Sequence, residues 1–206
     1  MKPPRIPIFP LELVLFPGST LPLHIFEPRY KQMIRECQQQ HLEFGVVLAH
    51  DDGVASVGCT AAIVEVFKQY SDGRMDILAA GRVPFRATEL FDEKPYLEAA
   101  VEYLVDQPAA AVLPAQAQLV SFYEQCYSVI HGRPPHRDTL PGGSSLSYQI
   151  AADLPLALEF KQELLELRSE EERQQSLLEK MQKWLPELQQ LNRARSKAGG
   201  NGHARA

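Results

Sequence analysis

The residues whose types could most readily do chemistry lie in one loop, HGRPPHRD, where His131, His136 and Asp138 supply three side chains able to bind a metal ion. A zinc site needs ligands that converge and a second shell of groups that orients them. The spacing here matches no standard zinc pattern, and Arg133 and Arg137 would repel a cation. We interpret the segment as a solvated loop and predict no metal site. An enzyme that uses this loop or a small-molecule pocket is kept as an alternative.

Other catalytic motifs are absent from the sequence or incomplete in it. Ser144 and Ser145 in GGSSLS do not fit the G-x-S-x-G elbow of hydrolases, and they stand where a helix would take an N-cap. The chain contains no Gly-Lys pair, which excludes a phosphate loop, and no G-x-G-x-x-G dinucleotide motif. His24 and Glu27 are three residues apart, but Pro28 follows them and the stretch is extended, so a structural histidine is expected. We predict no catalytic residue and no cofactor.

Composition limits the partners and the compartment. The chain has 206 residues, of which 45% are hydrophobic and 23% charged, with a net charge of −5. This length allows one large or two small domains with a real core, and the negative charge disfavours nucleic acid as a partner. Three distant cysteines, Cys37, Cys59 and Cys126, indicate free thiols. Prolines interrupt the apolar N-terminus, and no apolar run is long enough for a membrane span. We therefore expect a cytoplasmic protein without membrane contacts.

The first half of the chain has a strand-like pattern of short apolar runs between turn residues. Asp51–Gly53 and Ser71–Gly73 predict hairpin turns. The strand Thr60–Tyr70 is apolar on both faces near Ala61–Val66, which predicts a curved sheet that closes on itself. Pro28 fits the first position of a helix whose buried stripe is Tyr30, Met33, Ile34 and Cys37. The predicted strands are Arg5–Phe9, Glu12–Phe16, Glu43–Ala49, Ala55–Val57, Thr60–Tyr70, Met75–Ala80, Val83–Leu90 and Tyr96–Leu104.

The second half is predicted to be helical from about Pro108. Amphipathic spacing indicates a helix over Pro114–Ile130, a short one ending at Ala152, and a third over Leu154–Leu167. A fourth follows a capping box formed by Ser169 and Glu172, and Pro186 is expected to bend or end it. The predicted domains are a β-rich subdomain at 1–106, a helical subdomain at 107–191 and a disordered basic tail at 192–206.

The segment IPIFPLELVLFPGSTLPLHIFEPRY, Ile6 to Tyr30, resembles the start of the N-terminal substrate-binding domain of Lon proteases. The matching motifs are Phe16-Pro17-Gly18, Leu21-Pro22-Leu23 and Ile25-Phe26-Glu27. Later motifs follow in the family's order: VGCTAAIVEV from Val57, DGRMDILAAGRVPFR from Asp72, YLEAAVEYL from Tyr96 and KQELLELRSEEERQQSLLEKM from Lys161. The resemblance covers roughly residues 5 to 190.

This resemblance implies an α+β fold, in which an N-terminal β-rich pseudo-barrel of the PUA-like type, with one helix, precedes a helical subdomain. It also implies a non-catalytic role in binding unfolded or extended polypeptide segments or a partner protein. In the family's proteases an ATPase module and a peptidase domain with a Ser-Lys dyad follow, and the sequence contains neither. We therefore expect a stand-alone binding module that is not an enzyme. The sequence carries no signal for an oligomeric state.

The prolines of the first segment suggest where a ligand would bind. Pro17, Pro22 and Pro28 fix φ, so the segment can present apolar side chains on a rigid frame that lowers the ordering cost of binding. Most of its large apolar residues are expected in the core, with others lining an exposed groove. The predicted binding residues are Phe16, Leu21 and Phe26, with Gly81, Arg82 and Phe85 as a second group on the same face.

An RNA-binding module is the alternative function, by analogy with PUA-like barrels. It would need a basic stripe on the surface, because phosphate contacts dominate the affinity of proteins for nucleic acids. The candidate residues are Arg74, Arg82 and Arg86, together with Arg193, Arg195, Lys197 and Arg205 of the tail.

Overall fold

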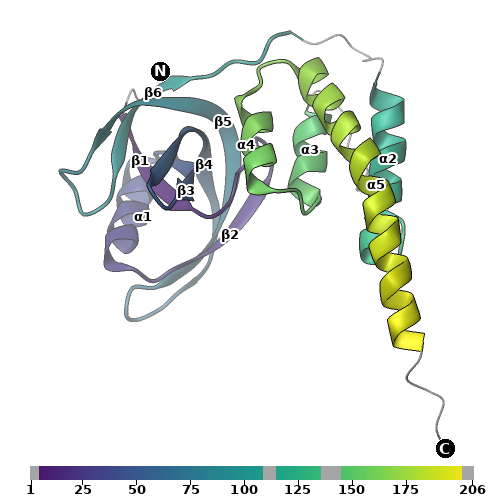
Figure 1. Ribbon diagram of the computed structural model, residues 1–206. Helices are drawn as coiled ribbons and strands as arrows, with labels where there is room; N and C mark the ends of the chain where they lie inside the picture. The colour runs from purple at the N-terminus through teal and green to yellow at the C-terminus, as the bar shows by residue number, and fades with distance from the viewer. Residues whose placement is uncertain (1–4, 109–114, 136–144, 201–206) are drawn as a thin grey trace, which may run out of the picture. The chain divides into compact units, whose positions relative to one another are not determined.

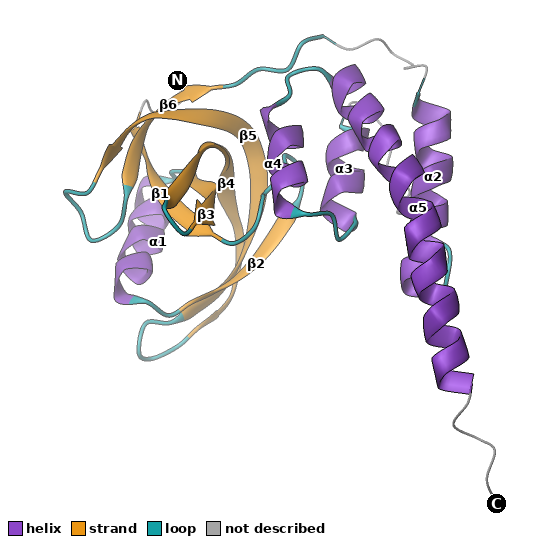
Figure 2. Cartoon of the chain, in the orientation of Figure 1, coloured by secondary structure: helices purple, strands orange, loops and turns teal. Residues whose placement is uncertain are grey.

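The computed structural model describes residues 5–108, 115–135 and 145–200, with side chains as far as 194. Tertiary contacts divide the chain into two compact units. The β-rich unit consists of Met1–Gln107 and Ala151–Arg168, and the helical unit of Pro108–Ile150 and Ser169–Ala206. Residues 151–168, which the sequence assigned to the helical part, thus group with the strands. Figures 1 and 2 show the strands of the β-rich unit curving around a common centre.

The β-rich unit is an α+β fold whose strands close into a ring, as the sequence predicted. β1 runs parallel to β3, and the pairs β3–β4, β4–β5, β5–β6 and β6–β1 are antiparallel, which returns the sheet to its first strand. β2 lies outside this ring and pairs with the first part of β5. The bounds are β1 Arg5–Leu11, β2 Thr20–Ile25, β3 Phe44–His50, β4 Gly53–Gln69, β5 Met75–Phe91 and β6 Glu98–Tyr103.

A compact apolar cluster fills the ring. Phe85 lies at its centre, fully buried, and packs with Ile6, Ile8, Val47 and Ala99 from three other strands. The strands around it contain glycines because the ring of Phe85 takes the space of their side chains. A Cβ added to Gly58 would lie 2.8 Å from Phe85 Cζ, closer than such atoms approach.

Helix α1 (Pro28–Gln40) begins with Pro28 and buries Tyr30, Met33, Ile34 and Cys37, which confirms the predicted helix and stripe. The ring of Tyr30 lies 4.1 Å from that of Phe9 on β1. The helix ends at His41, whose φ of 53° is left-handed, and the Leu42 N–H donates to the Cys37 carbonyl at 2.9 Å. This turn directs the chain into β3 after only two further residues.

Several strand predictions needed correction. The predicted strand at Glu12–Phe16 is wrong, because these residues form an irregular connection in which Leu15 and Phe16 are buried. β2 follows it instead, and its Pro22 is tolerated because β2 pairs with β5 on one side only among the described strands. Each of the long strands β4 and β5 joins two segments that the sequence had separated.

The remaining helices follow the predicted order: α2 Gln116–His131, α3 Leu146–Asp153, α4 Leu158–Glu166 and α5 Glu170–Gly200. The Ser169 hydroxyl accepts a hydrogen bond from the Glu172 N–H at 3.4 Å, the half of the capping box that its side chain provides. Pro186 lies inside α5, which continues to Gly200 and so includes part of the segment expected to be disordered. None of the described helices is long and apolar enough to cross a membrane.

Candidate functional site

The outer ends of three strands form a distinct surface of the β-rich unit, which we call the ribbon: β2 with Phe26 directly after it, residues 62–69 of β4 and residues 75–81 of β5. β4 pairs with β3 only up to Ala61, and beyond this point it pairs with β5. Ile77 and Ala79 of β5 and Ile25 of β2 are buried on one face of the ribbon. The alternation of a strand then turns residues such as His24 toward solvent.

The ribbon exposes large apolar side chains. The exposed fraction is 58% for Phe26 and 55% for both Val64 and Phe67, and Val66 is exposed as well. All residues from 64 to 69 are exposed, although consecutive side chains of a strand point to opposite faces. Both faces of this end of β4 are therefore open to solvent, and apolar groups gathered in this way are typical of interaction sites.

Next to these apolar groups, a polar cluster holds the ends of the three strands together. The Asp76 carboxylate lies 2.5 Å from His24 Nδ1 and accepts a hydrogen bond from the Tyr70 hydroxyl at 2.8 Å. These two bonds, first that of His24, lower the pKa of Asp76. His24 also stacks on Phe26 with the ring centroids 5.9 Å apart, and Lys68 Nζ lies 4.5 Å from the ring of Tyr70. His24 thus takes part in the contacts that hold the ribbon together.

The predicted binding residues are divided by the structure between core and surface. Phe16 was expected in an exposed groove but is fully buried, because its backbone packs tightly against Gly81: a Cβ there would clash with the Phe16 carbonyl. Phe85 is the centre of the core, and Leu21 is partly buried on β2. Only Phe26 and Arg82 are exposed. A role in binding for any of the six stays a prediction.

The two exposed members of this set are not neighbours. Phe26 follows Ile25, which pairs with Met75 at the start of β5, whereas Arg82 lies further along the same strand, next to Gly81. At about 3.3 Å per residue, the separation along β5 is roughly 20 Å. A single small ligand would not contact both.

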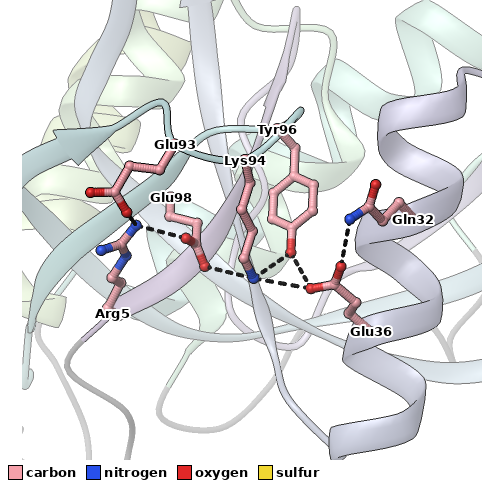
Figure 3. Close-up of polar contacts among 7 residues, drawn as sticks. All are labelled: Arg5, Gln32, Glu36, Glu93, Lys94, Tyr96 and Glu98. Carbon is pink, nitrogen blue, oxygen red and sulfur yellow. Dashed lines mark hydrogen bonds and ion pairs between the residues drawn. The ribbon is translucent and has the colours of Figure 1, made fainter.

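An extended set of polar contacts on the β-rich unit joins α1 to the connection between β5 and β6 (Figure 3). The Tyr96 hydroxyl donates to Glu36 Oε2 at 2.5 Å, and Lys94 Nζ donates to the same oxygen at 3.0 Å and to the Tyr96 oxygen at 2.8 Å. Gln32 donates to the other oxygen of Glu36 at 2.8 Å. Lys94 also lies 3.3 Å from Glu98 Oε1, so the contacts continue to β6.

Glu98 and Glu93 both bind the same arginine of β1. Arg5 donates to Glu98 and to Glu93, in both cases at 2.8 Å, and its guanidinium lies 3.9 Å from the ring of Phe91. The network therefore fastens β1, α1, β6 and the end of β5 to one another.

The pKa values of the groups in this network are shifted away from neutral pH, which makes these groups poorly suited to proton transfer there. Hydrogen bonds from Tyr96, Gln32 and Lys94 lower the pKa of Glu36 to about 2. Burial, followed by the hydrogen bond to Glu36, raises the pKa of Tyr96 to about 12, and the Tyr96 oxygen raises the pKa of Lys94. A general acid or base works best with a pKa near the operating pH. Together with the contacts that join α1, β1 and β6, these shifts favour a structural role for the network.

The helical unit contains a second ionic cluster, and it is closed to ligands. Arg173 on α5 is fully buried and donates to Glu170 at 2.9 Å and to the Ser147 hydroxyl at 3.0 Å. Glu170 accepts from the Ser147 N–H at 3.0 Å, at the start of α3, and the guanidinium lies over Tyr148. These contacts fasten α3 to α5.

A groove of about 760 Å³ lies elsewhere in the helical unit, lined by α2 residues such as Glu124 and Ser128 and by Pro134 and Gln189. Near the end of α2, His131 is exposed and contacts the ring of Tyr127. The other two residues considered as metal ligands, His136 and Asp138, lie outside the described residues. Within the described ranges no group of three His, Cys, Asp or Glu is arranged to hold a metal ion.

The arginines considered for RNA fall in both units of the described chain. Arg74 is paired with Asp72 at 2.7 Å and lies over the ring of Tyr70. Arg82 and Arg86 are exposed on β5, and Arg193 on α5 belongs to the other unit. The side chains of Arg195, Lys197 and Arg205 are outside the described part.

Sequence reasoning missed Val64 and Phe67 as surface residues. The apolar run on both faces near Ala61–Val66 indicates barrel closure, which the strand pairing confirms. It does not show that β4 continues past the start of β3. Irregularities in the pairing of β4 with β5, between Ile63 and Glu65 and between Val66 and Lys68, bring further apolar residues to this open end of the strand.

Comparisons with known proteins agree with this architecture. Residues 5–183 match the family model of the ATP-dependent protease La (LON) substrate-binding domain. A Lon protease of Anaeromyxobacter dehalogenans is 29% identical over 80% of this chain and 21% of its own length, and the Lon protease of Escherichia coli K12 is 25% identical over 94% and 26%. The chain thus spans about a fifth to a quarter of these curated relatives.

Solved structures show the same fold. The crystal structure of a Lon N-terminal domain protein from Xanthomonas campestris matches with a TM-score of 0.69 and 24% identity, covering 84% of this chain and 96% of that one. The N-terminal domain of the Mycobacterium avium complex Lon protease matches with a TM-score of 0.62 and 17% identity, covering 86% and 98%.

Proposed function

This chain belongs to the family of the Lon protease substrate-binding domain, and from that premise we propose that it binds exposed apolar segments of other polypeptides and catalyses no reaction itself. The family model is named for substrate binding, and the curated relatives are proteases of which this chain spans a minor part. The proposed ligand is an unfolded or extended segment of a polypeptide chain.

The observation that carries the proposal is the exposed apolar set of the ribbon. Phe26, directly after β2, and Val64 and Phe67 of β4 are each more than half exposed, while comparable residues of β2 and β4 such as Ile25 and Val57 are buried. Scattered single apolar residues on a surface are ordinary, but several on one set of paired strands favour an interaction site. An unfolded segment offers the apolar side chains that would cover them.

The ribbon is also held in a fixed shape. The hairpin between β4 and β5 is tied to α1 by Lys31, whose Nζ donates to the Asp72 carbonyl at 3.2 Å. Asp76 connects His24 of β2 to Tyr70 at the end of the hairpin. A surface ordered before its ligand arrives loses less conformational entropy on binding.

The test compares an unfolded with a folded chain. Reduced, carboxymethylated α-lactalbumin is titrated with the protein and binding is followed by fluorescence anisotropy, with native α-lactalbumin as the folded control. We expect saturable binding of the unfolded chain only. The double variant Phe26→Ser/Phe67→Ser is expected to weaken it about tenfold, because a few aromatic residues carry most of the binding energy of an interface.

A matched control is Leu90→Ser, which removes a half-exposed apolar side chain at the far end of β5. It is expected to bind the unfolded chain like the wild type. Equal weakening by Leu90→Ser would place the ligand elsewhere, and failure of the unfolded chain to bind at all would contradict the proposed function.

A further inference from the structure

Part of β4 has an open edge. β3 begins at Phe44, opposite Ala61, so residues 62–69 of β4 have β5 on one side and, among the described residues, no strand on the other. The backbone N–H and C=O groups that point away from β5 are thus available to a further strand.

The reason for this open edge lies in the end of α1. The left-handed turn at His41 leads the chain directly from the helix into β3, which begins at Phe44. No described strand therefore lies beside residues 62–69 of β4 in the place where a longer β3 would run. A groove of about 490 Å³ occupies this place. It is lined by the end of α1, including Gln38 and His41, and by the edge of β4 from Ala62 to Val66.

The groove has a defined charge. Glu43 and Glu65 line it, and it contains no lysine or arginine. Within the described part of the chain neither carboxylate forms an ion pair. Exposed sheet edges are often protected by lysine side chains, which discourage further strands. Lys68, near the outer end of this edge, lies beyond the groove lining and over the ring of Tyr70. The acidic lining would instead attract lysine or arginine side chains of an incoming segment.

We propose that an extended polypeptide segment with alternating apolar and basic residues binds this groove as an additional strand on β4. Its backbone pairs with the open edge at residues 62–69, its apolar side chains cover Val64 and Val66, and its basic side chains face Glu43 and Glu65. Backbone pairing gives affinity for many sequences, and the alternate side chains give the preference for basic ones. This inference rests on the proposed function and names its site and binding mode.

Hydrogen exchange measures the backbone pairing directly. The probe is a blocked heptapeptide of alternating valine and lysine, added to the full chain. The amides of residues 62–69 that point away from β5 are expected to exchange rapidly in the free protein and to become protected when the probe is bound. Binding through side chains on a face of the ribbon would leave these amides unprotected and would overturn the proposal.

Backbone methylation provides the second measurement. Two versions of the probe carry N-methyl groups on the valines or on the lysines, which removes the donors from one edge of the peptide at a time. Strand addition uses only one edge, so one version is expected to lose about tenfold or more in affinity and the other to bind like the parent. If both versions bind like the parent, the strand-addition mode is wrong.

The charge preference is tested with Glu43→Gln/Glu65→Gln, which is expected to weaken the probe about threefold to tenfold. The matched control is Glu12→Gln/Glu89→Gln, which removes two exposed carboxylates outside the groove. An equal effect of both pairs would contradict the assignment of the acidic lining.

The outcome for unfolded α-lactalbumin separates this inference from the proposed function. Binding of that chain without new protection at residues 62–69 refutes the strand addition and leaves the proposed function standing. Absence of binding by both the unfolded chain and the probe refutes both.

Discussion

Residues 57–61 of β4 lie between β3 and β5 and are all buried, whereas residues 64–69 of the same strand are all exposed. Both halves are rich in apolar residues, so hydrophobicity does not distinguish them. What differs is the number of neighbouring strands. The inner half of β4 belongs to the closed ring around Phe85, and the outer half extends past the point where β3 begins.

This difference separates stability from binding within one strand. The inner half can change only at the expense of the fold, because its side chains and backbone face a packed core. Substitutions in the outer half should leave the free energy of unfolding almost unchanged and act on ligands. The following substitutions test that separation by equilibrium unfolding of the full chain in urea.

The largest effect is expected for Phe85→Ala. Phe85 is fully buried at the centre of the ring, and removing its side chain leaves a cavity that the surrounding strands cannot fill. The free energy of unfolding should fall by about 3–5 kcal/mol. A loss below about 1 kcal/mol would mean that the ring is not the core of the unit.

A smaller loss is expected for Gly58→Ala. The added Cβ would lie 2.7 Å from Val47 Cγ1 and 2.8 Å from Phe85 Cζ, and it would also clash with the Val46 carbonyl oxygen. Overpacking of this kind destabilises by about 1–3 kcal/mol. Ser56→Ala, at an exposed position two residues earlier on β4, is the control and should be neutral.

The network around Glu36 lies on the barrel but is partly accessible to solvent, and it should give an intermediate effect. Glu36→Gln weakens the hydrogen bonds with Tyr96 and Lys94 and is expected to lower the free energy of unfolding by about 1 kcal/mol at neutral pH. Glu12→Gln, an exposed carboxylate on the connection after β1, is the control.

The same network predicts an acid dependence. The pKa of Glu36 is lowered from 4.5 to about 2, so the folded state holds this carboxylate in its charged form. Its contribution to stability is complete above pH 4.5 and is lost as the pH falls toward 2. The difference between wild type and Glu36→Gln should therefore disappear across this range, and a constant difference would assign the contribution to another group.

The smallest effect is expected for Phe67→Ala in the outer half of β4. Its ring is mostly exposed, so the free energy of unfolding should change by less than about 0.5 kcal/mol. Phe67 and Phe85 are the same residue type on neighbouring strands, and similar losses for the two would refute the separation drawn here.

The sequence predicted most of this architecture because local rules and packing agree there. Pro28 and the stripe from Tyr30 to Cys37 defined α1, and the Asp-Gly turns placed the hairpins on either side of β4. The motif order around them identified the family fold. Errors fell where tertiary contacts override the local pattern. β2 was missed because Pro22 disfavours a strand unless one of its edges is free of pairing.

The candidate site was harder to predict than the fold. Phe16 and Phe26 are equally apolar, yet Phe16 is buried and Phe26 is exposed. The close packing of the Phe16 backbone against Gly81 is a tertiary contact that the local sequence pattern does not contain. The open edge of β4 depends on where β3 begins, and that depends on the left-handed turn at His41. No periodicity in the residues of β4 contains this information.

The β-rich unit can complete its folding only after residues much later in the chain have been synthesised. Gln162 on α4 donates from Nε2 to the Val57 carbonyl at 3.0 Å, from a position 105 residues later in the chain. At ribosomal speeds of about 5–20 residues per second, this partner arrives roughly 5–20 s after the strand it contacts. A nascent chain that pauses before α4 therefore presents an incomplete barrel, and during this interval the protein itself would be a client for chaperones.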